Sequence, residues 1–245
     1  MSNDLKRKVI KGFRIILWKT IYYPITYIHG KYFADPNQSY VLHNRECMTE
    51  GKLEIEKKFY QDQEKINAFD GPGGRWLSFI EAHPEVRELS VDIGSGYGWL
   101  SVKLSKYFKK VIGIEPSAIQ IEIANKLCPP EIKNIEYRIG FAQDELKKLE
   151  IKDKTLFVTG CVLSHLPDKI VADICLIVSA KAPMGSLLAF NECWGKREYH
   201  RPMWHFRTQN WWKKQLPSWE INFLENEVKS WKNGENMGFH AIKIK

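Results

Sequence analysis

From Leu89 onward, short apolar runs alternate with helical segments, and this alternation limits the possible folds more than any other feature. We expect strands over residues 89–93, 110–115, 135–139, 155–161 and 186–192, and helices over 99–108, 118–127 and 168–180. Strands separated by helices of roughly ten residues form a parallel sheet with right-handed crossovers. Residues 219–225 and 239–245 are two further strands with no helix between them. The predicted class is therefore α/β: a Rossmann-like, doubly wound, mostly parallel seven-stranded sheet with an antiparallel C-terminal edge pair.

A chain of 245 residues is long enough for one domain with additions. We place the α/β domain over residues 89–245, with a lid-like insert at 193–218. An N-terminal helical extension precedes it, made of a basic amphipathic helix over residues 1–30 and a helical cap over residues 31–88. In the cap, apolar residues recur at helical spacing on both sides of the DGPGG segment, which cannot continue a helix.

The first helix combines positive charge with an apolar face. Residues 1–20 hold six Lys and Arg against one acid, and the apolar residues from Leu5 to Leu17 are three or four positions apart. Arg14 and Lys19 interrupt the apolar run, which argues against a signal peptide and against a membrane span. Two interpretations remain open. Residues 4–28 lie on an anionic membrane surface, or the helix packs its apolar face on the domain or on a second subunit.

Charge and cysteine content narrow the class of protein further. The net charge of +8 comes from the two ends, because residues 196–245 hold ten Lys and Arg against five acids, while residues 21–195 are about neutral. The five cysteines form no CxxC pair and no zinc-ligand spacing. We therefore expect reduced thiols in a cytoplasmic protein without a metal. Peripheral contact with the inner face of a membrane is compatible with that location.

The segment VDIGSGYG joins the first strand to the first helix and indicates a ligand site. Its glycines, Gly94, Gly96 and Gly98, have the spacing GxGxG, which differs from the GxGxxG of dinucleotide folds, and no Gly-Lys-Ser/Thr follows as in a P-loop. Glu115 ends the second strand, where an acid binds the ribose hydroxyls of an adenosyl group. Asp92 adds a second negative group near a ligand amine. A ligand with a ribose, a positive amine and no phosphate matches S-adenosylmethionine better than NAD.

Four motifs in order resemble those of the class I S-adenosylmethionine-dependent methyltransferases. They are VDIGSGYG, VIGIEPS, FVTGCVLSHLPD and KAPMGSLLAFNE, and the resemblance covers about residues 89–245. It implies S-adenosylmethionine as cofactor and S-adenosylhomocysteine as product. The implied cofactor-binding residues are Tyr60, Asp92, Gly94, Ser95, Gly96, Glu115, Pro116, Ala142, Gln143 and Cys161. Two positions depart from the family pattern: Ala142 and Gln143 stand where an acid is common, with Asp144 one place late, and Met184 replaces a glycine.

Candidate catalytic residues follow the fourth and fifth strands, where the acceptor is expected. His165 is a candidate base, with an orienting or helix-capping role as the alternative. Glu192 is a base or a substrate ligand, or the partner of a nearby Arg, and His200 is the next candidate. The segment 193–212 mixes aromatic and basic residues, so it is either a lid over the acceptor or a packing segment with a basic rim. The candidate substrate-binding residues are Arg75, Trp194, Arg197, Arg201 and His205.

The function that these features favour is O-methylation of a sugar, a glycan or another small hydroxyl acceptor, close to a membrane. An RNA methyltransferase is the first alternative, because positive charge and interleaved aromatic residues also suit nucleic acid. No RNA-binding module is recognisable and the body is mildly acidic, so nucleic acid is the weaker choice. A non-catalytic binding protein with the same fold is the second alternative. The sequence does not indicate an oligomeric state.

Overall fold

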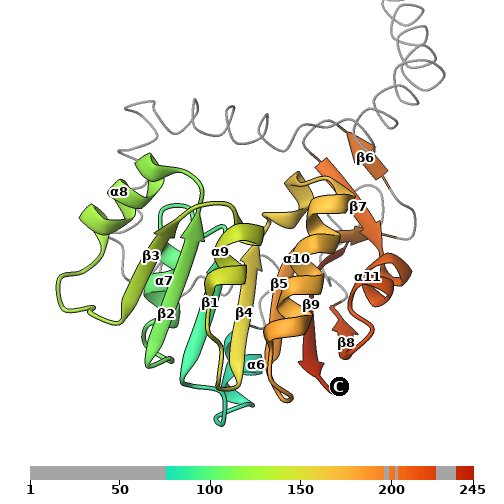
Figure 1. Ribbon diagram of the computed structural model, residues 1–245, viewed down its shortest axis with the longest axis horizontal. Helices are drawn as coiled ribbons and strands as arrows, with labels where there is room; N and C mark the ends of the chain where they lie inside the picture. Colours follow the sequence, from blue (N-terminus) through green and yellow to red (C-terminus); the bar gives the residue numbers. More distant parts are fainter. Residues whose placement is uncertain (1–75, 196–198, 202–203, 225–235) are drawn as a thin grey trace, which may run out of the picture.

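The computed structural model describes residues 76–195, 199–201, 204–224 and 236–245 (Figure 1). For residues 193, 195, 199–201, 204, 236 and 237 the description covers the backbone. The expected N-terminal helix and most of the expected cap, with Tyr60 and Arg75, lie outside the described residues and stay predictions.

One mixed sheet forms the centre of the molecule. Its parallel part has the order β3-β2-β1-β4-β5, and β9 pairs antiparallel with both β5 and β8. The strands are β1 Leu89–Ile93, β2 Lys110–Glu115, β3 Ile135–Ile139, β4 Thr155–Gly160, β5 Leu187–Gly195, β6 Tyr199–Arg201, β7 Trp204–Thr208, β8 Trp219–Phe223 and β9 Asn236–Lys243. The predicted fold class is thereby confirmed, including the antiparallel C-terminal pair. The described part of the sheet holds nine strands and not seven, because β6 and β7 add a hairpin beside the end of β5.

Helices cover both faces of the sheet (Figure 1). They are α6 Trp76–Glu81, α7 Trp99–Leu104, α8 Ala118–Leu127, α9 Ala142–Lys148, α10 Asp168–Lys181 and α11 Gln209–Gln215. In α10, Val171, Ile174, Cys175 and Val178 recur every three or four positions and are buried against the sheet. Burying a side chain of this size contributes roughly 1.5–3 kcal/mol, so this face alone fixes the helix on the sheet. Figure 1 shows α9 and α10 in front of the sheet and α7 behind it.

The helix α6 belongs to the body of the domain. Its buried residues Trp76 and Ile80 share a core cluster with Leu156 of β4 and Leu187 of β5. The helix α6 therefore packs on the sheet, and the domain boundary expected at residue 89 stays a prediction.

The insert and one helix differ from expectation. Residues 193–195 continue β5, β6 and β7 pair antiparallel with each other, and α11 follows with Thr208 as its N-cap. The sequence did not predict the helix α9, because its segment AQDELKK is short. Of its apolar residues, only Leu146 is deeply buried. Elsewhere the structure has the expected bounds for two strands, 110–115 and 135–139, and for the helix 118–127.

Candidate active site

The carboxyl ends of β1, β2, β4 and β5 meet at one edge of the sheet, the upper edge in Figure 1. The glycine turn after β1 is bound to the neighbouring strand, because the N–H groups of Gly94 and Ser95 donate to the carbonyl oxygen of Ile114 at 2.8 and 3.0 Å. Gly94, Gly96 and Gly98 have φ values of 74°, 53° and 80°. These are left-handed conformations that L side chains rarely adopt, so the turn depends on its three glycines.

The three glycines differ in what surrounds them. A Cβ atom on Gly94 would overlap the side chain of Val162, and one on Gly98 would overlap Tyr137. On Gly96 the built Cβ comes near one group only, the Oε1 atom of Gln120 at 3.2 Å. Gly94 and Gly98 therefore serve packing, whereas the bare backbone at Gly96 is the part of the turn that a ligand can approach.

Glu115 lies directly beside that open backbone. One carboxylate oxygen accepts from the N–H of Gly96 at 3.2 Å and the other from the N–H of Ser117 at 3.0 Å. Burial raises the pKa of Glu115, and these two bonds oppose the rise. Each oxygen keeps a lone pair, and the buried hydroxyl of Ser95 finds no hydrogen-bond partner among the described residues. A carboxylate and an unpaired hydroxyl around a bare backbone fit the ribose of an adenosyl group.

Asp92 is the second buried acid of this region, with 1% of its surface exposed. The hydroxyl of Ser101 donates to it at 2.7 Å, and the backbone of Ser101 also contributes, so Asp92 ties the start of α7 to β1. Burial raises the pKa of Asp92 to about 7, and the negative charge of Glu115 adds to the rise. The region thus holds two acids near the glycine turn, which suits a ligand that carries a positive group.

A tight turn after β4 forms the second half of the edge. Cys161 has a left-handed φ of 60°, and its N–H donates to the carbonyl oxygen of Asn191 at the end of β5. The 3-10 turn η3, Leu163–His165, follows directly. His165 is half-buried here, next in the chain to the turn residues that β5 holds. The structure brings Cys161 together with Asn191 and places the backbone of His165 in the adjoining turn, and the roles predicted for Cys161 and His165 stay predictions.

Glu192 is fully buried against this turn. Its Oε1 atom accepts from the N–H groups of Val162 and Leu163 at 2.9 and 3.0 Å. Its Oε2 atom accepts from the N–H and the hydroxyl of Ser164, both at 2.7 Å. Four donors occupy the carboxylate, so this geometry favours a positioning role, and a role as catalytic base stays a prediction that the contacts disfavour.

Asn191 places an amide at the same edge. Its side chain is 1% exposed, and its Nδ2 atom lies 3.8 Å from the sulfur of Cys161. Its Oδ1 atom has no hydrogen-bond partner within the described part of the chain. An unpaired buried carbonyl oxygen costs about 1–3 kcal/mol unless a ligand or water pairs with it. Asn191 was not among the predicted site residues. The signal that could have indicated it is a polar residue at the end of an apolar run.

Arg207 is the residue that sequence reasoning misplaced. It was counted among the basic residues of the insert, but its side chain is fully buried. Its Nε atom donates to Asp168 at 2.9 Å, and its terminal nitrogens donate to the carbonyl oxygens of Leu163 and Leu166. Its guanidinium lies 4.8 and 5.8 Å from the ring centres of Trp211 and Trp212. The mixture of aromatic and basic residues in the insert does not distinguish Arg207 from its neighbours.

The other insert residues divide into two groups. Trp194 is 3% exposed and its indole N–H donates to the carbonyl oxygen of Gly238 at 2.9 Å, while His205 is fully buried. These environments favour packing over contact with an acceptor, and the substrate role of both residues stays a prediction. His200 and Arg201 lie in β6, their side chains outside the described residues, as is all of Arg197.

The remaining predicted cofactor contacts lie at the same edge. Pro116 follows β2 beside Glu115. Ala142 and Gln143 open α9, directly after β3, and both are half-buried. Asp144 in the same first turn is exposed. The position of these residues agrees with the predicted site, and their contact with a cofactor stays a prediction.

Comparison with known proteins identifies the class of this domain. Residues 91–178 match a family model described as a methyltransferase domain. A Dictyostelium discoideum protein assigned to the methyltransferases is 51% identical over 67 residues, a match that spans 27% of this chain and 24% of that protein. The chain thus matches about a quarter of the length of that relative. Residues 91–178 therefore match a methyltransferase domain, and the fold agrees with the resemblance inferred from the four motifs.

Solved structures of the same fold have different acceptors in their names. The S-adenosylmethionine-bound amino pentose methyltransferase CalS10 of Micromonospora echinaspora superposes with a TM-score of 0.52 at 13% identity, covering 68% of this chain and 87% of that one. An rRNA methylase of Streptococcus thermophilus superposes with a TM-score of 0.53 at 11% identity, covering 70% of this chain and 96% of that one. The cofactor of this class is S-adenosylmethionine, as predicted, and the fold alone does not identify the acceptor.

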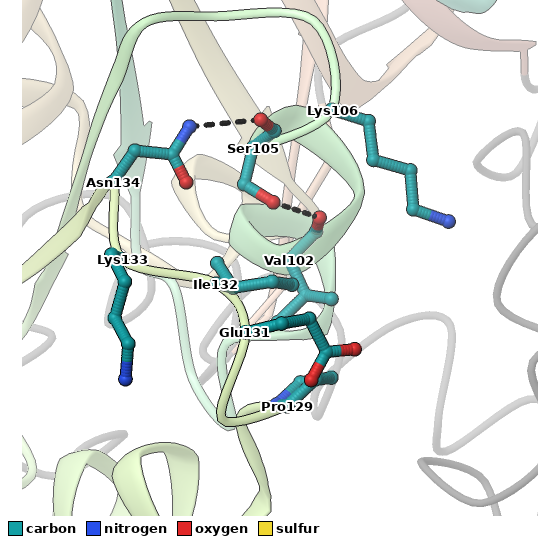
Figure 2. A pocket seen from close by; sticks show the side chains of 8 residues that line it. All are labelled: Val102, Ser105, Lys106, Pro129, Glu131, Ile132, Lys133 and Asn134. Carbon is teal, nitrogen blue, oxygen red and sulfur yellow. Dashed lines mark hydrogen bonds between the residues drawn. The ribbon is translucent and has the colours of Figure 1, made fainter.

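A pocket lies beside α7, and its lining residue Val102 shares an apolar cluster with Tyr97 of the glycine turn. Figure 2 shows it between the end of α7 and the segment that leads into β3, with a volume of about 620 Å³. Asn134 shapes it by donating to the carbonyl oxygens of Ser105 and Phe108, both at 2.8 Å. None of the predicted site residues lines this pocket. In the described part of the chain, no acidic, His and Cys cluster could hold a metal ion, and no helix could span a bilayer.

Proposed function

We propose that this chain is an S-adenosylmethionine-dependent methyltransferase that methylates a hydroxyl group of a small acceptor, in particular a sugar or glycan. The observation that carries the proposal is the pairing of two sites at one sheet edge. The open backbone at Gly96 lies beside the Glu115 carboxylate, and Val162 of the turn that carries His165 packs directly on Gly94. A cofactor half and an acceptor half are therefore in contact.

When bound, S-adenosylmethionine supplies a methyl group that its sulfonium already activates. The chain then has to hold the two reactants in line and exclude water. Glu115 binds the ribose hydroxyls, and Asp92 provides negative charge for the cationic end. The buried Ser95 hydroxyl, which finds no partner among the described residues, is available to the same ligand.

On the acceptor side, His165 takes the proton of the acceptor hydroxyl. Imidazole suits this step because its charge changes near neutral pH. Glu192 is the less suitable base, since four donors already occupy its oxygens. The Oδ1 atom of Asn191 accepts a hydrogen bond from the acceptor and orients it, which explains why a buried oxygen lacks a partner within the described chain.

The charge around this edge supports a neutral acceptor over RNA. Residues 76–195 carry 14 Lys and Arg against 15 Asp and Glu, so the body of the domain offers no general attraction for phosphates. Arg207 lies next to the acceptor half, but its guanidinium is buried and donates to Asp168 and to two carbonyl oxygens. RNA stays the second candidate because the rRNA methylase shares the fold and the chain ends are basic.

The test is an acceptor screen with S-adenosylmethionine labelled on its methyl group, using extracts separated into lipid, glycan and nucleic-acid fractions. We expect label in the glycan or lipid-linked glycan fraction. His165→Ala should lower turnover by roughly 10²–10⁴-fold while cofactor affinity, measured by calorimetry, stays within about twofold. The matched control is His83→Ala, a histidine on the α6 side of the sheet. Label in nucleic acid alone would overturn the proposal, and absence of cofactor binding would favour a non-catalytic protein.

A further inference from the structure

The turn η3 lies between two buried, oppositely charged side chains. Glu192 accepts from the N–H groups at its beginning, residues 162–164. Arg207 donates to the carbonyl oxygen of Leu166, which caps the other end of the turn, and to that of Leu163 within the turn. The ends of a helical turn carry partial positive charge on their free N–H groups and partial negative charge on their free carbonyl groups. Each side chain therefore has the charge that its end of the turn requires.

Arg207 comes from the segment expected as a lid or a packing segment, and Glu192 lies in β5 directly before that segment. The pair Trp194 and Arg207 lies in register between β5 and β7, so the hairpin brings Arg207 to the end of β5. The pairing of β5 with β9 shifts register between Phe190 and Cys193, the stretch that contains Glu192. Such a bulge redirects the side chains of a strand next to a site. Residues far apart in sequence are thus joined around one turn.

Burial makes these contacts strong. Glu192 and Arg207 are both fully buried, so neither charge is screened by water. Burial lowers the pKa of Arg207, and the charges of Asp168 and Glu192 oppose that fall, which keeps the guanidinium protonated. The rings of Trp211 and Trp212 cover the guanidinium from one side. The turn therefore has little freedom to shift.

We propose that Arg207 and Glu192 are a positioning pair that fixes the place of His165 at the acceptor edge. The proposal rests on the proposed function for its effect on turnover, but not for its effect on structure. The cofactor half has its own local bonds, between Glu115, Gly96 and Ser117, and neither member of the pair takes part in them. The pair should therefore affect the acceptor step and leave cofactor affinity nearly unchanged.

Lys243 offers a matched control in the same chain. It is a buried cation that donates to the carbonyl oxygen of Ser179 at 2.7 Å and to the hydroxyl of Ser218 at 2.9 Å. It also lies 5.6 Å from the ring centre of Trp219. It pairs in register with the start of β8, at the opposite edge of the sheet. Replacing Lys243 removes a similar set of contacts without touching the turn.

The experiment compares Arg207→Lys and Glu192→Gln with Lys243→Met in the full chain. Thermal unfolding, the Kd for S-adenosylhomocysteine, turnover on the acceptor found by the screen, and the NMR signal of the His165 ring are measured for each. We expect the first two variants to shift the His165 signal and to lower kcat by about tenfold or more, with the Kd within about twofold. Lys243→Met should lower the unfolding temperature and leave kcat and the His165 signal unchanged.

Each outcome decides between the two proposals. An unmoved His165 signal in both Arg207→Lys and Glu192→Gln would overturn the positioning pair, whichever acceptor is methylated. An equal loss of kcat in Lys243→Met would do the same, because the loss would then follow stability alone. If the His165 signal shifts but the wild-type chain methylates no acceptor, the pair stands and the proposed function fails. If Arg207→Lys does not fold, Glu192→Gln, which keeps one acceptor oxygen, gives the same measurement.

Discussion

The two halves of the site are built in different ways. The cofactor half is local: Glu115 is bound by the N–H groups of Gly96 and Ser117, one directly after its own strand and one in the preceding turn. The acceptor half depends on Glu192 and Arg207, which lie 28 to 44 residues from the turn residues that they bind. One half can therefore form from short segments, whereas the other forms only when the whole fold is assembled.

The buried acids show the same difference. Asp92 is held by one residue, Ser101, and its pKa is raised to about 7. Glu192 accepts from four donors. Burying a carboxylate is costly unless donors stabilise its charge. In the acceptor half, donors occupy both oxygens of Glu192. In the cofactor half, Asp92 leaves room for a positive ligand.

The largest effect should follow the loss of Glu192. Glu192→Ala leaves four donors unsatisfied and removes the negative charge that faces Arg207, so we expect a loss of about 3–5 kcal/mol in the free energy of unfolding. Urea denaturation measures it. Glu192→Gln, the control, keeps an acceptor oxygen and should lose less. A variant as stable as wild type but without turnover would restore Glu192 as the catalytic base and remove the contrast between the halves.

A smaller effect on the free energy of unfolding is expected at Asp92, where the neutral form of the acid favours the folded chain. Because its pKa rises from 3.8 to about 7 on folding, the folded chain keeps a proton that the unfolded chain releases. The stability from this group is fully present below about pH 4 and is lost as the pH rises toward 7. Asp92→Asn cannot ionise, so its stability relative to wild type should rise over that range, by at most about 4 kcal/mol.

Urea denaturation at several pH values tests this directly. The raised pKa of Glu115 contributes in the same sense in both chains, so it cancels in the difference between wild type and Asp92→Asn. Ser101→Ala is a second variant, and it should strengthen the dependence by removing the hydroxyl that stabilises the charge. A difference that does not vary with pH would show that Asp92 is ionised in the folded chain.

The loss of Glu115 should weaken cofactor binding. Glu115→Ala removes the carboxylate beside Gly96, so we expect cofactor binding to weaken by roughly 1–3 kcal/mol. Calorimetry with S-adenosylhomocysteine measures it, and Glu122→Ala, on the exposed side of α8, is the control. Equal affinity in Glu115→Ala and wild type would place the nucleoside elsewhere and remove the cofactor half as defined here.

The same contrast explains what the sequence could predict. The glycine turn, Glu115 and the strands around them are encoded in contiguous segments, so spacing and alternation were sufficient to place them. Arg207 and Glu192 gain their roles from strand pairing and from a register shift within β5. No local pattern distinguishes a buried Arg from an exposed one in an aromatic and basic segment. The sequence therefore left the insert open as a lid or a packing segment, and its described part packs on the core.

The smallest effect tests whether that packing role is correct. Trp194 donates to the carbonyl oxygen of Gly238 at 2.9 Å and its ring meets Phe223 edge-on at 5.3 Å. Trp194→Phe loses that hydrogen bond and a little volume, so we expect about 1–2 kcal/mol less stability and an unchanged KM for the acceptor. If the indole instead belonged to a lid, KM would rise while the unfolding midpoint stayed in place. Because the two roles move different quantities, one variant separates an insert that holds the acceptor half in position from an insert that closes over it.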